Sequence, residues 1–336
     1  MTETLDRQEG RRSGPGADSR RSGFRHEAFF YAGMEDFAEG VASFVRGGLD
    51  AGEPVMVALR RGEIELVRRK LGNRADDVAF VDMAQLGRNP ARIIPAWRQF
   101  VAAHPDEAVR GVGEPIWSGR SHDEVEECQL YETLLDVALG DPADGFWLLC
   151  PYDVDLLDAA VLGEARRSHP YVAEGGHSGT NPSFRSNMGA VVLDTALAPP
   201  SGDVHELEFD EQSLPAVRRS VTEWAGSHLT PEHTTDMVLA VHEIATNSIR
   251  HGGGAGRLRC WMHEGAMFVC EVSDAGRFER PLVGRVQPPT DDEVGRGLWL
   301  ANQLCELVQV RSGPEGTVVR LHSACHGRDH APSAAR

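Results

Sequence analysis

The sequence predicts two folded halves of different class, an α/β domain followed by an α+β domain. Its 336 residues exceed the size of one typical domain, and 41% of them are hydrophobic, which is enough for two cores. In the first half, short apolar runs alternate with amphipathic stretches, whereas in the second half two long helical stretches precede most of the strands. Between the halves, the glycines and prolines of residues 174–204 interrupt any regular period, which predicts a linker.

The first half, residues 24–173, has the strand–helix rhythm of a mostly parallel sheet with helices on both faces. The runs Val55–Leu59 and Phe146–Cys150 are continuously apolar, as expected of strands that are buried on both faces. Strands are expected at 28–31, 54–59, 78–83, 108–117 and 146–152, and helices at 35–49, 63–71, 91–103, 123–139 and 158–167. A stray edge strand at 190–193 is left open.

The second half, residues 205–323, predicts an α+β sandwich, in which helices cover one face of a mixed or antiparallel sheet. Its clearest helix has Thr230 as N-cap, Pro231 in its first turn and three glycines after its end. Strands are expected at 206–209, 257–262, 267–273, 307–311 and 317–321, helices at 213–227, 230–251 and 297–305, and a hairpin turn at Glu264-Gly265.

Composition excludes several classes of function. The formal net charge is −17 and no basic patch is visible, so we expect no nucleic-acid partner. No apolar run approaches the roughly 20 residues that cross a bilayer, so we expect no membrane association and a cytoplasmic location. Residues 1–23 and 324–336 are expected to be disordered tails. Lys70 is the only lysine and lies in an expected surface helix, which argues against P-loop and Schiff-base chemistry.

The cysteines and the C-terminal histidines could form a metal site, but buried free thiols and a disordered tail are the favoured interpretation. The six cysteines are scattered without a C-x-x-C pair, and several lie in apolar stretches, which predicts buried free thiols. His322, Cys325, His326 and His330 fit no zinc spacing closely and run into a polar tail. A disordered tail is therefore the favoured interpretation of that segment.

Polar residues at helical spacing mark a candidate ligand site in the second half. Glu243 and Asn247 lie four residues apart in the expected helix 230–251, so both side chains project from one face. A carboxylate beside a carboxamide can hold a hydrated magnesium ion. Taken alone, such a pair is more often an ordinary solvated helix face.

Two glycine-containing motifs follow in chain order. Asp274 ends an apolar strand and is followed by Ala-Gly, where the backbone can approach a flat ring and the carboxylate can accept hydrogens from a base. An ordinary Asp-x-Gly turn is the alternative. The run Gly295–Gly297 opens a helix whose free N–H groups can bind phosphate. Residues 277–294 between the motifs are long, acidic and contain Pro and Gly, which suits a mobile flap over a nucleotide.

Together these motifs resemble the N, G1 and G2 boxes of the GHKL ATPases, and the compact form of the half looks most like the anti-sigma factor serine kinases of bacteria. The resemblance implies a Bergerat-type sandwich that binds ATP and Mg²⁺. The motifs are Glu243-Ile244-Ala245-Thr246-Asn247 with Arg250-His251-Gly252, then Asp274-Ala275-Gly276, Gly295-Arg296-Gly297-Leu298 and Gly316-Thr317.

The resemblance also implies roles for single residues. Asn247 would ligate Mg²⁺ through ATP, Asp274 would bind adenine, and Glu243 would be the general base toward the attacking hydroxyl. The other residues that the resemblance places at the nucleotide are His251, Gly276, Gly295, Arg296, Gly297, Leu298 and Thr317. The implied protein partner is a sigma factor or an anti-sigma antagonist, and a homodimer is left open.

Two alternatives to a serine/threonine kinase are kept. A histidine kinase needs an acceptor histidine on a dimerisation helix, but none of the four His-Glu pairs sits suitably, so this class is disfavoured. A non-catalytic ATP-binding anti-sigma or scaffold module is the stronger rival, and the presence of Glu243 argues mildly against it. The four pairs begin at His26, His205, His242 and His263.

The first half resembles the MEDS sensory domain of bacterial regulators over residues 24–172. The resemblance implies a RecA-like sheet, and the lack of a phosphate loop indicates a non-catalytic version. Ligands of open α/β sheets bind beyond the carboxyl ends of the strands. A small-molecule pocket is therefore expected there, although His122 is favoured as part of a capped helix start. The pocket would gather Tyr31, Arg60, Glu114, Trp117, His122, Tyr152 and Asp153. The matching motifs are Phe29-Phe30-Tyr31, Met34-Glu35-Asp36-Phe37, Gly113-Glu114-Pro115-Ile116-Trp117 and Leu149-Cys150-Pro151-Tyr152-Asp153.

Overall fold

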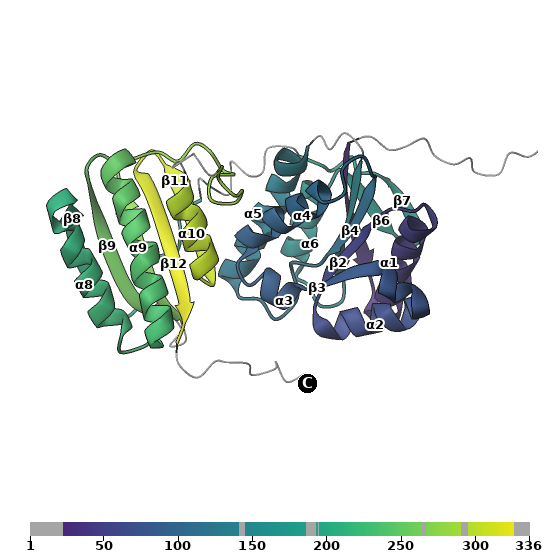
Figure 1. The fold of residues 1–336 in the computed structure, drawn as a ribbon, viewed down its shortest axis with the longest axis horizontal. Coiled ribbons are helices and arrows are strands. Elements are labelled where there is room, and N and C mark those ends of the chain that lie inside the picture. The colour runs from purple at the N-terminus through teal and green to yellow at the C-terminus, as the bar shows by residue number, and fades with distance from the viewer. Residues whose placement is uncertain are drawn as a thin grey trace, which may run out of the picture.

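The computed structural model describes residues 23–140, 145–185, 193, 195–263, 267–289 and 295–325. It contains two domains side by side, each with its own sheet and its own cover of helices (Figure 1). The first domain carries the purple-to-teal elements and the second the green-to-yellow ones.

The first domain is built on a seven-stranded sheet in the order β3-β2-β4-β5-β1-β6-β7. Strands β1 to β6 run parallel, and β7 runs antiparallel to β6. The predicted α/β domain with a mostly parallel sheet is thus confirmed, while its RecA-like identity stays a prediction. The strands are β1 (Phe24–Tyr31), β2 (Val55–Leu59), β3 (Val78–Asp82), β4 (Val109–Gly113), β5 (Phe146–Asp153), β6 (Tyr171–Glu174) and β7 (His177–Thr180).

Helices cover both faces of this sheet and create two apolar cores. One core lies under α1 and α2 and includes Phe37 and Val67, and the other lies under α4, α5 and α6 and includes Trp97. Ser121 begins α5 with a capping box, in which Glu124 bonds back to the N-cap backbone. The helices are α1 (Gly33–Asp50), α2 (Arg61–Leu71), α3 (Met83–Leu86), α4 (Ile93–Ala102), α5 (His122–Leu139) and α6 (Ala159–Ser168), with short 3-10 turns η1 (Gly72–Asp77) and η2 (Pro90–Arg92).

The expected linker begins later than predicted. Strand β7 lies inside the stretch that we expected to be linker, and it pairs with β6 through a hairpin. Gly175 and Gly176 both have positive φ, as a tight two-residue hairpin turn requires. In the sequence alone, the same glycines look like the start of a linker. Of the edge strand expected at 190–193, residues 190–192 lie outside the described residues.

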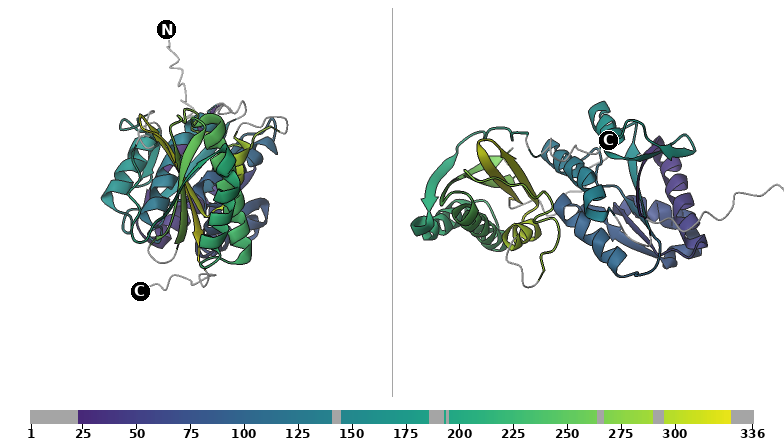
Figure 2. Two further views of the ribbon diagram at one scale, coloured as in Figure 1. Left: turned by 90° about the vertical axis from the view of Figure 1, so that its left-hand side faces the viewer. Right: turned by 90° about the horizontal axis from the view of Figure 1, so that it is seen from above.

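The second domain is a five-stranded antiparallel sheet in the order β11-β12-β10-β9-β8, with α8, α9 and α10 on one face (Figure 2, right). The α+β sandwich is confirmed, and each element was predicted within a few residues of its bounds. The expected turn at Glu264-Gly265 lies outside the described residues. The elements are β8 (His205–Asp210), η3 (Glu211–Ser213), α8 (Leu214–Ala225), α9 (Pro231–His251), β9 (Ala255–His263), β10 (Met267–Asp274), α10 (Arg296–Leu304), β11 (Leu307–Gly313) and β12 (Gly316–Ala324).

The cysteines and the C-terminal end differ little from expectation. All six cysteines are free and five are buried, as predicted. Strand β12 continues to Ala324, one residue into the expected tail, and buries His322 against Gln309. His326 and His330 lie outside the described residues. Among the helices that the structure describes, none combines the length and the apolar character needed to cross a membrane.

Candidate functional site

Helix α9 presents Glu243 and Asn247 toward the start of α10. The helix begins at the Thr230 N-cap, whose hydroxyl accepts a hydrogen bond from the His233 amide at 3.1 Å. Both predicted site residues are half-buried. A methyl group at Gly297 would come within 2.9 Å of Glu243 Oε2 and 3.2 Å of Asn247 Nδ2, so only glycine lets α10 approach this closely. The N-box and G2-box residues therefore meet in space.

The buried stripe of α9 is rotated slightly from the predicted one. We expected Val238, Val241, Ala245 and Ile249 to face the core. Val241 and Ala245 are buried, but Val238 and Ile249 are only partly buried. Their places in the core are taken by other residues of the helix, because α8 and α10 flank α9 and widen its covered face. These residues are Met237, Ala240, Ile244 and Ser248.

The Asp274 carboxylate at the end of β10 is held by two hydrogen bonds. Its Oδ2 accepts from the Ser248 hydroxyl at 2.6 Å, and its Oδ1 accepts from the Gly276 amide at 2.8 Å. A Cβ at Gly252 would overlap the carboxylate, and a Cβ at Gly276 would lie 2.7 Å from the His251 carbonyl oxygen. The glycines thus let the end of α9 and the turn after β10 pack closely around a fixed carboxylate.

Thr317 at the start of β12 ties the neighbouring segments together. Its hydroxyl donates to the Gly276 carbonyl oxygen at 2.9 Å and lies 3.0 Å from the Ser312 hydroxyl. Ser312 in turn accepts from the Phe278 amide at 2.8 Å. Gly316 has a φ of 125°, and a Cβ there would strike the Asp274 carbonyl oxygen. This network fixes the first residues of the 277–294 segment beside Asp274.

A cavity of about 470 Å³ lies between these elements, within the size range of small-molecule sites. Seven of the nine residues that we expected at the nucleotide line it. Gly297 lies against Glu243 and Asn247 instead, and Arg296 is exposed at the helix start. The expected residues that line the cavity are Asn247, His251, Asp274, Gly276, Gly295, Leu298 and Thr317.

Helix α10 directs its amino end toward this cavity. Gly295 precedes the helix in the left-handed conformation, with a φ of 82°, and also lines the cavity. The first N–H groups of a helix have no partner within the helix and carry the positive end of its dipole. Such an end favours a phosphate group. The cavity therefore offers a fixed carboxylate at Asp274, a carboxamide at Asn247 and an anion-binding helix end, which together fit a magnesium nucleotide.

The carboxyl end of α10 is capped by the first domain. Arg92, which ends η2, donates from Nε to the Asn302 carbonyl oxygen at 2.8 Å and from Nη2 to those of Gln303 and Cys305 at 2.8 and 2.9 Å. Asn89 Nδ2 donates to the carbonyl oxygens of Asn302 and Cys305 at 3.2 and 3.3 Å. A cation at this end complements the helix dipole. One helix thus joins the first domain to the candidate phosphate site.

The described part of the flap, residues 277–289, is docked on both domains. Arg285, which is 5% exposed, donates to Glu127 Oε2 of α5 at 2.6 Å. Asn302 of α10 donates to the Gly284 carbonyl oxygen at 2.9 Å. Apolar flap residues divide between the cores: Phe278 and Val283 pack on the second domain, and Leu282 and Val286 on the first. The segment that lines the cavity is therefore fastened at its middle to α5.

Part of the expected sensory cluster forms at the carboxyl edge of the first sheet. The Tyr31 hydroxyl donates to Glu114 Oε1 at 2.8 Å, and Arg60 Nη2 lies 3.8 Å from Glu114 Oε2. Trp117 stacks near Arg60, 5.5 Å from ring centroid to guanidinium carbon. Burial is the main cause that raises the pKa of Glu114 to about 7, against the lowering effect of Arg60. A buried carboxyl here can carry a proton near neutral pH.

Of the other expected pocket residues, Asp153 stays beside the cluster, whereas Tyr152 and His122 lie elsewhere. Asp153 pairs in register with Tyr31 and shares its face of the sheet, so Tyr152 points to the opposite face, where its ring lies 5.5 Å from that of His169. His122 is exposed at the capped start of α5, 3.3 Å from Glu126. The expectation of a capped helix start therefore describes His122 better than a pocket role.

Several residues at the site were not foreseen from the sequence. The Ser248 hydroxyl orients the Asp274 carboxylate. Its position directly after Asn247 on the same helix was the signal in the sequence that could have placed it at the site. Ser312 bonds Thr317 across the β11–β12 hairpin, which a register prediction would have found. Nothing local marks Glu127 and Arg285, because their pairing spans 158 residues.

Comparison with known proteins agrees with this architecture. The model of the MEDS family, the methanogen/methylotroph, DcmR sensory domain, matches residues 25–170. That of the histidine kinase-like ATPase domain matches residues 207–323. No curated protein matches the chain. A solved structure, of the RsbU and RsbW domains of Rv1364c from Mycobacterium tuberculosis, is 17% identical with a TM-score of 0.29, and the match covers 37% of this chain and 33% of that one. The chain therefore joins an amino-terminal MEDS domain to a carboxyl-terminal histidine kinase-like ATPase domain, as both resemblances in the sequence indicated.

Proposed function

We propose that this protein is an ATP-dependent serine/threonine kinase of the anti-sigma factor type. The observation that carries the proposal is that Asn247, Asp274 and the residues at the amino end of α10 line one cavity, while Glu243 lies beside Asn247 against Gly297. A histidine kinase-like ATPase domain implies ATP binding, and the retained carboxylate at Glu243 supplies the group that a transfer to a hydroxyl needs.

Each site residue has a proposed task in that transfer. Asp274 would accept the amino hydrogens of adenine, and Asn247 would hold the Mg²⁺ that accompanies the nucleotide and offsets its negative charge. The amino end of α10 binds the phosphate oxygens. Glu243 accepts the proton of the partner's serine or threonine hydroxyl while the hydroxyl oxygen bonds to the γ-phosphorus. The bond between the γ-phosphorus and the β,γ-bridging oxygen breaks, and ADP leaves.

We further propose that the partner is an anti-sigma antagonist or a sigma factor in the cytoplasm. The net charge of −17 supports a protein rather than a nucleic-acid partner. A histidine kinase is less well supported, because His26 and His242 lie in a strand and in α9, not on a dimerisation helix.

The MEDS domain is proposed to control the kinase through two contacts. Arg92 caps the helix whose other end would bind phosphate, and Glu127 holds the flap through Arg285. Both contacts come from the first domain and both act on elements that line the cavity. A ligand that moves α5 or η2 would therefore change the position of the flap or of α10. The pocket at Tyr31, Arg60, Glu114 and Trp117 is the proposed place for such a ligand.

Phosphotransfer with labelled ATP tests the proposal. The purified protein, Mg²⁺ and γ-labelled ATP are expected to label a serine or threonine on a cognate anti-sigma antagonist. Glu243→Ala removes the proposed base, so labelling should fall about 10²–10⁴-fold, while ATP still binds. Equal labelling by the variant would remove Glu243 as the base. A partner complex that forms fully with a non-hydrolysable analogue, without any labelling, would indicate a scaffold instead of a kinase.

A further inference from the structure

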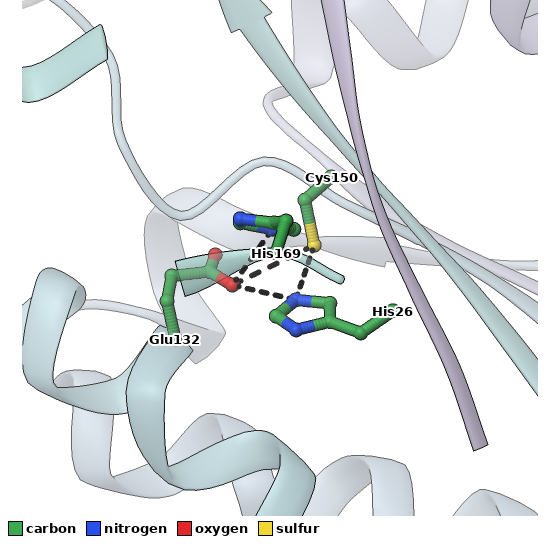
Figure 3. A group of neighbouring side chains, drawn as sticks. All are labelled: His26, Glu132, Cys150 and His169. Atoms are coloured by element: carbon green, nitrogen blue, oxygen red, sulfur yellow. Dashed lines mark hydrogen bonds and ion pairs between the residues drawn. The ribbon is translucent and has the colours of Figure 1, made fainter. Parts of the chain in front are cut away.

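Four side chains that can ligate a metal converge inside the MEDS domain, on the opposite face of the sheet from Glu114. They come from four separate places: His26 on β1, Glu132 on α5, Cys150 on β5 and His169 just after α6 (Figure 3). Each is at most 2% exposed. One donor atom from each residue lies within 4.8 Å of the other three. The proposed function uses none of these four residues.

The spacing of the donor atoms fits a tetrahedral ion. His26 Nε2 lies 2.9 Å from Glu132 Oε2 and 3.4 Å from Cys150 Sγ, and Cys150 Sγ lies 3.7 Å from Glu132 Oε2. His169 Nε2 lies 3.4 Å from the same Glu132 oxygen. Zinc bonds of about 2.0–2.3 Å place neighbouring tetrahedral ligands about 3.3–3.8 Å apart. The four donors thus need only small shifts to surround one ion.

The orientation of His169 points to a cation in the cluster. Its Nδ1 lies 2.7 Å from the Ala165 carbonyl oxygen, and because that oxygen can only accept, Nδ1 carries the hydrogen. In the neutral ring, Nε2 then turns a lone pair toward a carboxylate oxygen of Glu132. Two facing lone pairs repel each other in a buried site, whereas an ion between them would bind both. The carbonyl bond is also the kind of outer contact that orients a metal-binding histidine.

Other polar atoms in the cluster lack hydrogen-bond partners. Within the described chain, His26 Nδ1, Glu132 Oε1 and His169 Nε2 are buried and make no hydrogen bond. The Asp136 carboxylate, one turn after Glu132 on α5, lies 3.9 Å from His26 Nδ1 and could orient that ring from outside. A simple ion pair between His26 and Glu132 would not explain why His169 and Cys150 also point at the same carboxylate. Burying such a pair also carries a large desolvation cost.

We propose that His26, Glu132, Cys150 and His169 form a closed zinc site. Two imidazoles, one thiolate and one carboxylate make a ligand set suited to Zn²⁺, and four protein ligands with no exposed position are typical of a structural site. The ion would fasten α5 and the segment after α6 to strands β1 and β5. Because Glu127 lies on the same helix as Glu132, the site would also fix the helix that holds the flap.

Metal content and Co²⁺ spectroscopy test the site in the full-length chain without a histidine tag. The protein purified with Zn²⁺ present is expected to hold about one zinc per chain after dialysis. Replacing it with Co²⁺ should give the strong visible bands of a tetrahedral site and a thiolate-to-cobalt band in the near ultraviolet. Folded wild-type protein that retains no zinc, or that retains copper or iron instead, would overturn the proposal.

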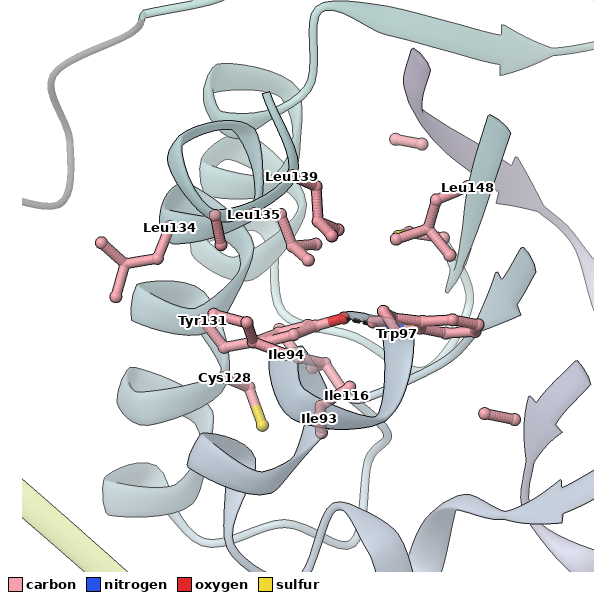
Figure 4. Close-up of a cluster of buried hydrophobic side chains, with 14 of the residues drawn as sticks. Ile93, Ile94, Trp97, Ile116, Cys128, Tyr131, Leu134, Leu135, Leu139 and Leu148 are labelled. Carbon is pink, nitrogen blue, oxygen red and sulfur yellow. Dashed lines mark hydrogen bonds between the residues drawn. The ribbon is translucent and has the colours of Figure 1, made fainter. Parts of the chain in front are cut away.

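Single variants assign the bands to the cluster. Cys150→Ser should lose the thiolate band, whereas Cys128→Ser should keep it. Cys128 is equally buried in the same core (Figure 4), but its thiol donates to the Pro115 carbonyl oxygen instead. Cys325→Ser should also keep it, which separates this cluster from the C-terminal histidines. If Cys150→Ser does not fold by circular dichroism, His169→Gln keeps the thiol and should bind Co²⁺ at least about tenfold more weakly. Unchanged Co²⁺ affinity and spectrum in the folded variants would refute the site.

Discussion

At the scale of single residues, the Asp274 carboxylate is the group that we propose accepts hydrogen bonds from adenine. Ser248 and Gly276 each donate one hydrogen bond to it, so the carboxylate is held before any ligand arrives. A preorganised acceptor loses little freedom on binding, which favours affinity. Glycine at positions 252 and 276 makes this arrangement possible, because a Cβ at either would collide with the carboxylate or with the backbone of α9.

We expect Asp274→Asn to weaken ATP binding about 10–100-fold, because a hydrogen bond to a charged group contributes roughly 1.5–3 kcal/mol. Ser248→Ala removes only one of the bonds that orient the carboxylate, so its loss should be smaller. Equilibrium binding of a fluorescent ATP analogue to both folded variants checks the order. A larger loss in Ser248→Ala than in Asp274→Asn would show that Asp274 does not contact the base.

Glu114 gives the MEDS domain a predicted pH dependence. Its folded pKa is raised from 4.5 to about 7, mainly by burial, so between these values the folded state holds a proton that the unfolded state has lost. The stability that Glu114 contributes is therefore complete below pH 4.5 and is lost as the pH rises through about 7. The full difference in the free energy of unfolding is on the order of 3 kcal/mol.

Urea unfolding of the full chain at several pH values measures this effect. Glu114→Gln cannot ionise but keeps an acceptor for the Tyr31 hydroxyl. The free energy of unfolding of the wild type should fall relative to that of the variant as the pH rises from 4.5 to 7. Parallel curves for the two proteins over this range would mean that Glu114 is ionised throughout.

At the scale of elements, α10 and the flap link the two domains. Arg92 and Asn89 occupy the carboxyl end of α10, and its amino end opens on the cavity. The flap is held by Glu127, which also accepts from Arg311 Nη1 at 2.6 Å. Its neighbour Glu126 contacts Arg311 but has no described bond to the flap. Both of these adjacent carboxylates on α5 therefore contact Arg311, but only Glu127 also bonds the flap.

Glu127→Gln should loosen the flap, because it removes the charge that pairs with buried Arg285. Faster opening should raise the dissociation rate of a fluorescent ATP analogue, measured by stopped flow. Glu126→Gln is the matched control, since it leaves the bond from Arg285 to Glu127 intact. Equal dissociation rates in the wild type and both variants would show that the flap contact does not control the nucleotide.

Elements with a strong local signal were predicted well, and long-range contacts were not. The caps at Thr230 and Ser121 and the apolar strands set most helices and strands of both domains within a few residues, although α3 and β6 were not expected. The hairpin around Gly175 was missed, because glycines that make a tight turn look in composition like those of a linker. The metal cluster was also missed, since its members His26 and His169 are separated by more than a hundred residues and meet only when the sheet forms.

At the scale of the whole molecule, the MEDS domain contacts both α10 and the flap of the ATPase domain. The zinc cluster, the flap contact and the packing of the first core all involve α5. The cap on α10 comes from η2, which packs beside α5. A change in the first domain therefore has a short path to the cavity through packed elements. The proposed function requires that the cavity of the second domain bind a magnesium nucleotide.

Isothermal titration of the full-length wild-type protein with ATP in the presence of Mg²⁺ tests that requirement most directly. We predict saturable binding of one ATP per chain. The dissociation constant should lie in the micromolar to millimolar range, which corresponds to a binding free energy of about −8 to −4 kcal/mol. GTP should bind much more weakly, because its base presents a carbonyl oxygen where adenine presents an amino group to Asp274. No binding of ATP by folded protein, or equal binding of ATP and GTP, would contradict the assignment of this cavity.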